Sequence, residues 1–393
     1  MWLRHQDVEE DCRLARLGGL APHPEHHLGI LKQRLVDAFV EPERVDLLGS
    51  SRSLIVLAID GLAYDIASAS WAPDLLAAVS STFPSVSSAA WLTASTGLTP
   101  SKHGVVGVVF EDEAVDGVYN CYLDQEQSHV RSVSPARAIE LGPWPTLFSE
   151  LAAMGVQCTA HVGDLARYPG RWSRAVTHGA CVVNPPVRQS GENSIGPADI
   201  AYIAMNAVDH TVTSAVSREP ALVWAFLNFD DHIHLNGYDA QIVSALKDLE
   251  CTIAAWVRDG HSVLAHSDHG LVPTHSSERC AMLMEWLNDS RLCRSPAGGA
   301  GRTLWAYPKP EHERVLVERV AELAEPFAHV LSREDLADLS LVERNPLVER
   351  RVGPLVLIAK DAEFPLFDAR YRYEHGSLLA QEMLVPVALW RGI

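Results

Sequence analysis

The chain has 393 residues, of which 47% are hydrophobic and 21% are charged, a balance typical of a folded globular protein and not of a disordered one. Its 32 lysines and arginines against 50 aspartates and glutamates give a formal net charge of −18. This charge argues against a polymeric nucleic acid as a partner, because such binding depends on neutralising phosphates. No apolar run approaches the roughly 18 residues of a membrane span, so no membrane partner is expected.

The first residues, Met1 to Asp7, lack the basic stretch and apolar core of a secretory signal, so we expect a cytoplasmic protein. The seven cysteines are odd in number and contain no C-x-x-C pair. This predicts reduced cysteines and neither a disulfide framework nor a cysteine zinc site. The sequence does not indicate an oligomeric state.

Residues 1–50 are predicted to form a helical N-terminal lead-in, and residues 51–393 a single α/β domain. Apolar runs typical of buried strands occupy residues 54–59, 157–162, 221–229, 262–265, 355–359 and 383–389. Helical patterns separate several of them, at residues 146–154, 200–216, 240–257 and 311–323. This alternation predicts a parallel or mixed sheet sandwiched by helices. Residues near 107–142 and 275–350 fit the alternation poorly, so we interpret them as cap insertions over the sheet edge.

Polar side chains follow several of the apolar runs, where open α/β sheets bind their ligands. Asp60 closes the first strand, Asp230 and His234 follow the third, Asp268 and His269 follow the fourth, and His375 precedes the last. Any one of these residues alone is more often a helix cap or an ordinary core or surface histidine. Together at successive strand ends they predict a site for a divalent metal, because carboxylate and imidazole are ligands of zinc and similar ions.

A second candidate element is the Ser/Ala-rich run that begins after Pro84 and ends at Gly97, which is predicted to be a helix. A serine in its first turn lies beside unpaired backbone N–H groups and the positive end of the helix dipole. That position suits a nucleophile that attacks a phosphate, although a serine there is commonly just an N-cap.

These motifs, taken in order, resemble the alkaline phosphatase superfamily, and within it the type I phosphodiesterase/nucleotide pyrophosphatase branch. The resemblance runs from about residue 54 to the C-terminus. It rests on Ile59-Asp60-Gly61, Phe83-Pro84-x-x-Ser87, Thr96-Gly97-x-x-Pro100-x-x-His103-Gly104, Asp230-x3-His234-x2-Gly237, Ser267-Asp268-His269-Gly270, His375-Gly376 and Glu382-Met383-x-Val385-Pro386.

The resemblance implies an alkaline-phosphatase-like fold and two divalent metal ions. We expect zinc, with manganese or iron as alternatives. One ion is held by Asp230, His234 and His375, and the other by Asp60, Asp268, His269 and the oxygen of Ser87. The family nucleophile stands three residues after the motif proline, which selects Ser87 over Ser88. His103 matches a loop-shaping position, whereas Asp231, His232 and His266 match no ligand position.

The implied activity is hydrolysis of a small phosphorylated substrate through a covalent Ser87 intermediate, on phosphodiester or nucleotide pyrophosphate bonds. Two features depart from the family. Ala90 stands where nucleotide pyrophosphatases carry an asparagine, so the donor to the phosphoryl oxygen is left open. Residues 104–180 contain no lysine, which argues against the lysine-dependent phosphonoacetate hydrolases. Arg167, Arg171 and Arg174 form a basic cluster that a solvated loop also explains.

Two other functions stay open on the sequence alone. One is a phosphomonoesterase for an intracellular metabolite, since the caps that select the leaving group are the parts least defined by pattern. The other is a non-catalytic metal-binding or regulatory homologue, against which the complete ligand set argues.

Overall fold

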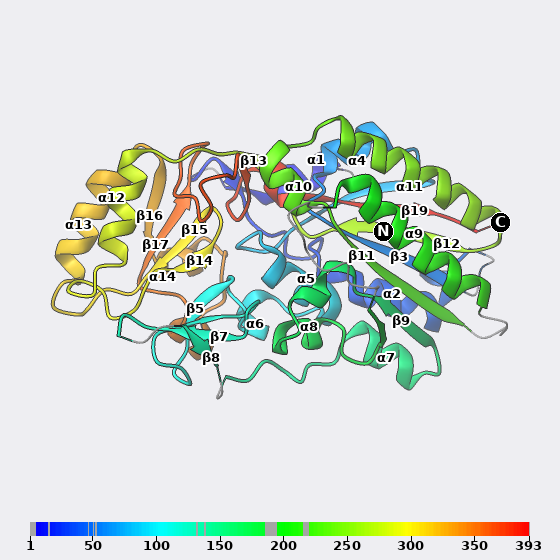
Figure 1. The fold of residues 1–393 in the computed structure, drawn as a ribbon, viewed down its shortest axis with the longest axis horizontal. Coiled ribbons are helices and arrows are strands. Elements are labelled where there is room, and N and C mark those ends of the chain that lie inside the picture. The colour runs from blue at the N-terminus through cyan, green and yellow to red at the C-terminus, as the bar shows by residue number, and fades with distance from the viewer. Residues whose placement is uncertain are drawn as a thin grey trace.

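The computed structural model describes residues 5–14, 16–45, 47–49, 51, 53–130, 133–136, 139–184, 195–214 and 220–392. Two sheets lie side by side, each with its own helices, and the chain passes between them more than once (Figure 1). The site described below lies where the strands of the larger α/β unit end toward the second sheet.

The first sheet has seven strands in the order β10-β9-β11-β3-β12-β19-β4. Five of them, β10, β9, β11, β3 and β12, pair in parallel, whereas β19 is antiparallel to both of its neighbours. This mixed sheet confirms the predicted α/β fold class. The strands are β3 (Ser53–Asp60), β4 (Leu75–Ser80), β9 (Gln157–His161), β10 (Cys181–Val183), β11 (Ala221–Asn228), β12 (Ser262–Ser267) and β19 (Leu384–Trp390).

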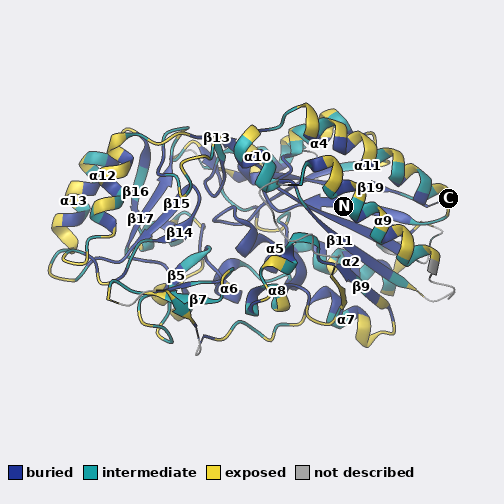
Figure 2. Ribbon diagram, in the orientation of Figure 1, coloured by how far each residue is buried: buried dark blue, intermediate teal, exposed yellow. Residues whose placement is uncertain are grey.

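The central strand β3 is apolar from Leu54 to Ile59 because both faces of the sheet are covered (Figure 2). Leu54, Val56 and Ala58 enter one core, and the alternate residues of the strand enter the other. One face is covered by α4 (Tyr64–Ser70), α9 (Pro197–Ser214) and α11 (Ala240–Arg258). The opposite face is covered by α2 (Ile30–Val40), α5 (Ser87–Thr96), α7 (Leu147–Ala153) and α8 (Arg171–Val176).

The second sheet is antiparallel, with eight strands in the order β16-β17-β15-β14-β5-β6-β7-β8. Residues near both expected insertions contribute to it. The strands are β5 (Val109–Glu111), β6 (Val118–Asn120), β7 (Gln125–Gln127), β8 (Ser134–Pro135), β14 (Gly298–Ala300), β15 (Thr303–Ala306), β16 (Ala328–Ser332) and β17 (Leu355–Ala359). Helices α12 (Glu278–Leu287) and α13 (Glu313–Ala324) pack on one face of this sheet.

The apolar run at residues 355–359, expected in the parallel alternation, is β17 of this second sheet. Leu355 and Leu357 pack under α12 and α13, whereas Val356 and Ile358 pack into the core shared with the first sheet. A strand covered on both faces is apolar throughout whichever sheet it belongs to, so hydrophobicity alone could not place it.

Shorter elements connect these layers. The shorter elements are α1 (His5–Cys12), β1 (Arg13–Leu14), β2 (Gly19–Leu20), α3 (Pro42–Val45), α6 (Pro100–His103), η1 (Gly163–Arg167), α10 (Asp230–Asn236), β13 (Val272–Pro273), α14 (Arg333–Asp338), α15 (Pro346–Arg351), β18 (Tyr373–Glu374) and α16 (Ala380–Met383). Within the first 50 residues, β1 and β2 form a two-stranded sheet in addition to the expected helices. Within the described residues, no helix combines the length and the apolar character needed to cross a bilayer.

Candidate active site

The carboxyl ends of β3, β11 and β12 meet at one edge of the first sheet, and each delivers an acidic residue there. Asp60 is the last residue of β3, Asp230 is the first residue of α10 after β11, and Asp268 follows β12 directly. These strands are parallel neighbours in the sheet, which is why side chains distant in sequence come together.

Two histidines approach Asp230 from different elements. His234 lies one turn further along α10, with its Nε2 atom 3.0 Å from Oδ2 of Asp230. His375 follows β18, and its Nε2 atom is 4.0 Å from Oδ1 of Asp230. The Nδ1 atom of His234 lies 2.8 Å from the carbonyl oxygen of Tyr373, and the Nδ1 atom of His375 lies 2.9 Å from the carbonyl oxygen of Ser85. When each Nδ1 carries its proton toward a carbonyl oxygen, the Nε2 atoms on the side of Asp230 are the ones available to a metal, the arrangement of a metal-ligating histidine.

Ser87 is the first residue of α5, and its hydroxyl lies between two other members of the cluster. Its Oγ atom is 3.2 Å from Oδ1 of Asp60 and 3.0 Å from Nε2 of His269. The indole of Trp91, one turn further along α5, donates to Oδ2 of Asp60 at 3.3 Å. Gly97, with φ of 73°, ends the helix. Ser87 thus combines the N-terminus of a helix with direct contact to two candidate ligands.

The ligand atoms form overlapping groups in which every atom lies within 4.8 Å of the others. One group joins Asp60, Asp268 and His269, the residues expected to share an ion with Ser87. The residues expected to hold the other ion are divided between two further groups. These groups consist of Asp230, His269 and His375, and of His234, Glu374 and His375.

The electrostatics of the cluster reflect burial and crowding. Burial, followed by the charges of Asp268 and Asp230, raises the pKa of Asp60 well above its usual range. Burial raises the pKa of Asp268 to about 6 and lowers the pKa of His269 to about 4. Burial lowers the pKa of His234, but the charge of Asp230 outweighs burial and raises that pKa to about 10. Three carboxylates thus crowd together, and in the described part of the chain no lysine or arginine forms an ion pair with them.

The donor set fits divalent metal ions. Asp230 Oδ1, Asp268 Oδ2 and His269 Nδ1 are buried without a hydrogen-bond partner, although buried polar atoms are nearly always paired. Carboxylate oxygens and neutral imidazole nitrogens are the ligands that zinc and related ions take, and a cation would also offset the repulsion between the carboxylates.

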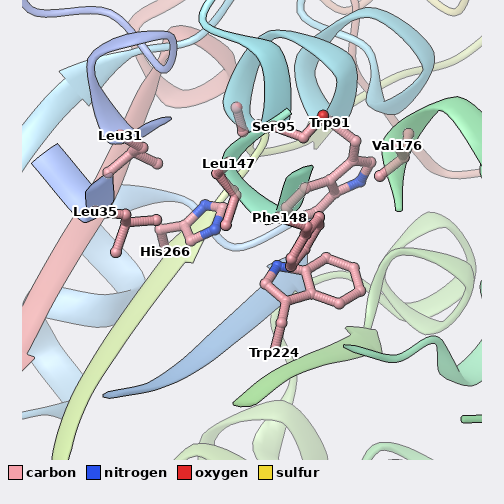
Figure 3. A pocket seen from close by; sticks show the side chains of 10 residues that line it. Leu31, Leu35, Trp91, Ser95, Leu147, Phe148, Val176, Trp224 and His266 are labelled. Carbon is pink, nitrogen blue, oxygen red and sulfur yellow. The ribbon is translucent and has the colours of Figure 1, made fainter. Parts of the chain in front are cut away.

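Residues predicted to have no ligand role have other partners or surroundings. Asp231 pairs with Arg167 at 2.8 Å, and His232 lies 3.1 Å from Asp239. His266 is buried beneath α5 and lines a cavity of about 10 Å³ together with Trp91, Trp224, Phe148 and three leucines (Figure 3). Ala90 is fully buried in the core and offers no side-chain donor.

The three arginines of the basic cluster are engaged by the protein. Arg167 contacts Asp164 at 2.9 Å as well as Asp231. Arg171 contacts Asp124 at 2.5 Å and the carbonyl of Ala136, and Arg174 donates to the carbonyl of Pro169. These contacts favour the interpretation of the cluster as loop structure.

The structure adds residues that the sequence did not suggest. Glu374 is buried, with Oε1 3.7 Å from Nδ1 of His234 and 3.6 Å from Nε2 of His375. Tyr122, from the turn between β6 and β7, packs edge-on against Trp172, whose indole donates to the carbonyl of Ser88 at 2.8 Å. Glu374 directly precedes the predicted ligand His375, and this adjacency could have indicated it in the sequence. No sequence signal indicated Tyr122, because only the folding of the second sheet brings it near α5.

Comparison with known structures agrees with this architecture. Murine ectonucleotide pyrophosphatase/phosphodiesterase 5 is 15% identical, with 86% of this chain and 88% of that chain covered and a TM-score of 0.58. Phosphonoacetate hydrolase from Sinorhizobium meliloti 1021 is 16% identical, with 86% and 89% covered and a TM-score of 0.57. The alkaline phosphatase PafA is 12% identical, with 86% and 91% covered and a TM-score of 0.60. No curated protein matches the sequence.

Fold and site together define a hydrolase of phosphoric esters in the alkaline phosphatase superfamily, whose members use divalent metals. Residues 54–377 match the family described as type I phosphodiesterase/nucleotide pyrophosphatase. The chain belongs to that family, as the sequence motifs predicted.

Proposed function

We propose that the protein hydrolyses phosphodiester or nucleotide pyrophosphate bonds through a covalent intermediate on Ser87, with two divalent ions, of which zinc is the expected metal. The observation that carries this proposal is the position of the Ser87 hydroxyl. It lies at the N-terminus of α5 and contacts both Asp60 and His269.

In this proposal Asp230, His234 and His375 hold one ion, and Asp60, Asp268 and His269 hold the other together with the Ser87 oxygen. When bound, the ions supply positive charge that lowers the pKa of the nucleophile and offsets charge on the phosphoryl group.

The residues of the chain position the reacting groups. The Oγ atom of Ser87 forms a bond to phosphorus, and the bond from phosphorus to the leaving oxygen breaks. Water then cleaves the seryl ester and returns the serine hydroxyl. The proposal places the phosphoryl oxygens at the N-terminus of α5, where the first backbone N–H groups of a helix have no intrahelical partner and favour an anion.

The charges near the site favour a diester over a monoester. A monoester carries an additional negative charge that a cation must offset. Lys102 pairs with Glu343 at 3.4 Å, and Arg167 is shared between Asp164 and Asp231. The structure of an inactive threonine-to-alanine variant of the murine relative contains AMP, and the Sinorhizobium enzyme has been solved with phosphonoformate. Both ligands carry the tetrahedral phosphorus that this proposal places beside Ser87.

The proposal is tested with metal-loaded protein and two nitrophenyl substrates. We expect kcat/KM for bis-nitrophenyl phosphate to exceed that for nitrophenyl phosphate. Ser87→Ala should lower turnover by on the order of 10³-fold or more, since it removes the nucleophile. Ser88→Ala is the matched control, because the Ser88 side chain is fully buried and is not part of the metal cluster. Equal loss in both variants would contradict Ser87 as nucleophile, and a tenfold monoester advantage would make the protein a phosphatase.

A further inference from the structure

Glu374, the last residue of β18, is a buried carboxylate whose neighbours within ion-pair distance are histidines. Its side chain is 3% exposed, with Oε1 3.7 Å from Nδ1 of His234 and 3.6 Å from Nε2 of His375. In the described part of the chain, no lysine or arginine forms an ion pair with it. A buried carboxylate is costly unless a cation pairs with it or a metal ion lies beside it. The charge of Glu374 therefore has no permanent partner among the described side chains.

The hydrogen bond that Glu374 makes does not require this charge. Its Oε1 atom accepts from the backbone N–H of His375 at 3.1 Å. A glutamine side chain has the same length and also ends in an oxygen acceptor. The backbone is fixed independently of the side chain, because β18 pairs with β13 and places Glu374 opposite Val272. The negative charge needs another explanation.

The two ion positions of the proposed function differ in the charge that their ligands supply. The position beside Ser87 has two carboxylates, Asp60 and Asp268, whose charges balance those of a divalent ion. The other position has the single carboxylate of Asp230 and two imidazoles, so a divalent ion there keeps an excess positive charge in a buried site. A second carboxylate on that side removes the excess.

Glu374 lies where such a carboxylate is needed. Its candidate ligand atom and those of His234 and His375 lie within 4.8 Å of one another. Asp230 approaches the same two histidines but belongs to a different group of candidate ligands. Glu374 is thus placed beside the ligands of this ion and not in one ligand group with Asp230.

We propose that Glu374 is a positioning residue whose negative charge strengthens the binding of the ion held by Asp230, His234 and His375, without itself becoming a ligand. This inference rests on the proposed function, which assigns that ion to those three residues. Groups that act on a metal from outside its ligand shell typically change the metal affinity by about 10- to 100-fold. Loss of this charge should weaken the binding of one ion and leave the other unchanged.

The test compares Glu374→Gln with Glu363→Gln in zinc titrations against a competing chromophoric chelator. Glutamine keeps the acceptor for the N–H of His375 and removes the charge, so a side chain with a purely structural role would tolerate the change. Glu363 lies upstream in the same connection, accepts from the Ser277 hydroxyl and is outside the metal cluster. We expect Glu374→Gln to bind one of two zinc ions at least about tenfold more weakly, and Glu363→Gln to bind both as the wild type does.

Two further measurements separate the charge from other roles of Glu374. The unfolding midpoint should rise less with zinc in Glu374→Gln than in the wild type, whereas a structural defect would lower the midpoint equally with zinc and with chelator. The ligand-field spectrum of the cobalt-saturated variant should match that of the wild type, because no ligand has been removed. Equal lowering of the midpoint, or an altered spectrum, would overturn the charge role.

Zinc affinity and turnover are independent readouts, so this inference and the proposed function can fail separately. If the wild type binds two zinc ions and hydrolyses the diester, and Glu374→Gln stays within about threefold in both affinities, the Glu374 inference is wrong and the proposed function stands. If the variant loses affinity for one ion but the wild type has no diesterase activity, the inference stands and the proposed function fails. A wild type that neither binds zinc nor hydrolyses the diester overturns both.

Discussion

At the scale of single residues, Asp60 connects Ser87 to the core of the protein. Its Oδ1 atom accepts from Ser87, and its Oδ2 atom accepts from the indole of Trp91. Trp91 is in turn packed edge-on against Phe226, with ring centroids 5.5 Å apart. The carboxylate orientation is thus set by a fully buried aromatic side chain, which limits its rotation more than contact with solvent would.

His103 shows how a histidine of the family motif serves structure. Its Nδ1 atom accepts from the backbone N–H of Val105 at 3.1 Å, and its Nε2 atom lies 3.1 Å from Oγ1 of Thr93. The first contact requires a neutral ring, because a protonated Nδ1 cannot accept a hydrogen bond. Burial lowers the pKa of His103 to about 3, and the nearby charge of Arg351 acts in the same direction.

This environment predicts a pH dependence of stability. Between pH 6.5, the ordinary value for histidine, and the folded value of about 3, the unfolded chain binds a proton at His103 that the folded chain does not. The free energy of unfolding should therefore fall as pH decreases through this range, by up to about 1.4 kcal/mol per pH unit. His103→Gln cannot take up that proton, so we expect a slope shallower by that amount in urea unfolding measured at several pH values. An unchanged slope would contradict the assignment.

At the scale of elements, the β14–β15 hairpin of the second sheet holds the loop that carries His375. The backbone N–H of Arg302 donates to the His375 carbonyl at 2.7 Å, and Thr303 donates to the carbonyl of Gly376 at 2.6 Å. The Arg302 side chain donates to Glu382 at 3.0 Å, and neither side chain has any exposed surface. Glu382 also accepts from the backbone N–H of Ser377.

We expect Arg302→Met to lower the free energy of unfolding by about 3–5 kcal/mol, because Glu382 is left as a buried carboxylate without its cation. Metal content at the His375 side of the site should fall as the loop loosens. The double variant Arg302→Met/Glu382→Gln removes the charge and keeps an acceptor for Ser377, so it should recover much of the stability. Denaturant unfolding with metal analysis measures both effects, and a double variant as unstable as the single one would refute the ion-pair explanation.

At the scale of the whole molecule, the candidate site depends on both sheets. The first sheet supplies Asp60, Asp230 and Asp268 at its strand ends, and the second supplies the hairpin that supports the loop of His375. The strand ends were predictable, because long apolar runs ending in Asp or His give a strong pattern. The second sheet was not, because its strands are short, and β14 is Gly298-Gly299-Ala300, with no alternation of polar and apolar residues.

The site itself could be predicted by residue type but not by geometry. The strand ends and motifs indicated which carboxylates and histidines converge. They could not indicate that His269 also lies within reach of Asp230 and His375, or that Glu374 lies near both His234 and His375. Those distances depend on the antiparallel pairing of β13 with β18 and on loop contacts between the two sheets.

The last prediction concerns metal removal from the intact protein. The ligand cluster joins strand ends of the first sheet to a loop held by the second, so an ion that binds only the folded chain should stabilise the whole molecule. Such an ion adds about 2.7 kcal/mol to the free energy of unfolding at a free concentration one hundred times its dissociation constant. We therefore expect a chelator to abolish turnover and lower the unfolding midpoint, and titration with zinc to restore both. His375→Ala should reduce the zinc-dependent rise, whereas His329→Ala, on β16 outside the cluster, should keep it. Unfolding that is identical with zinc and with chelator would exclude a metal centre at these residues.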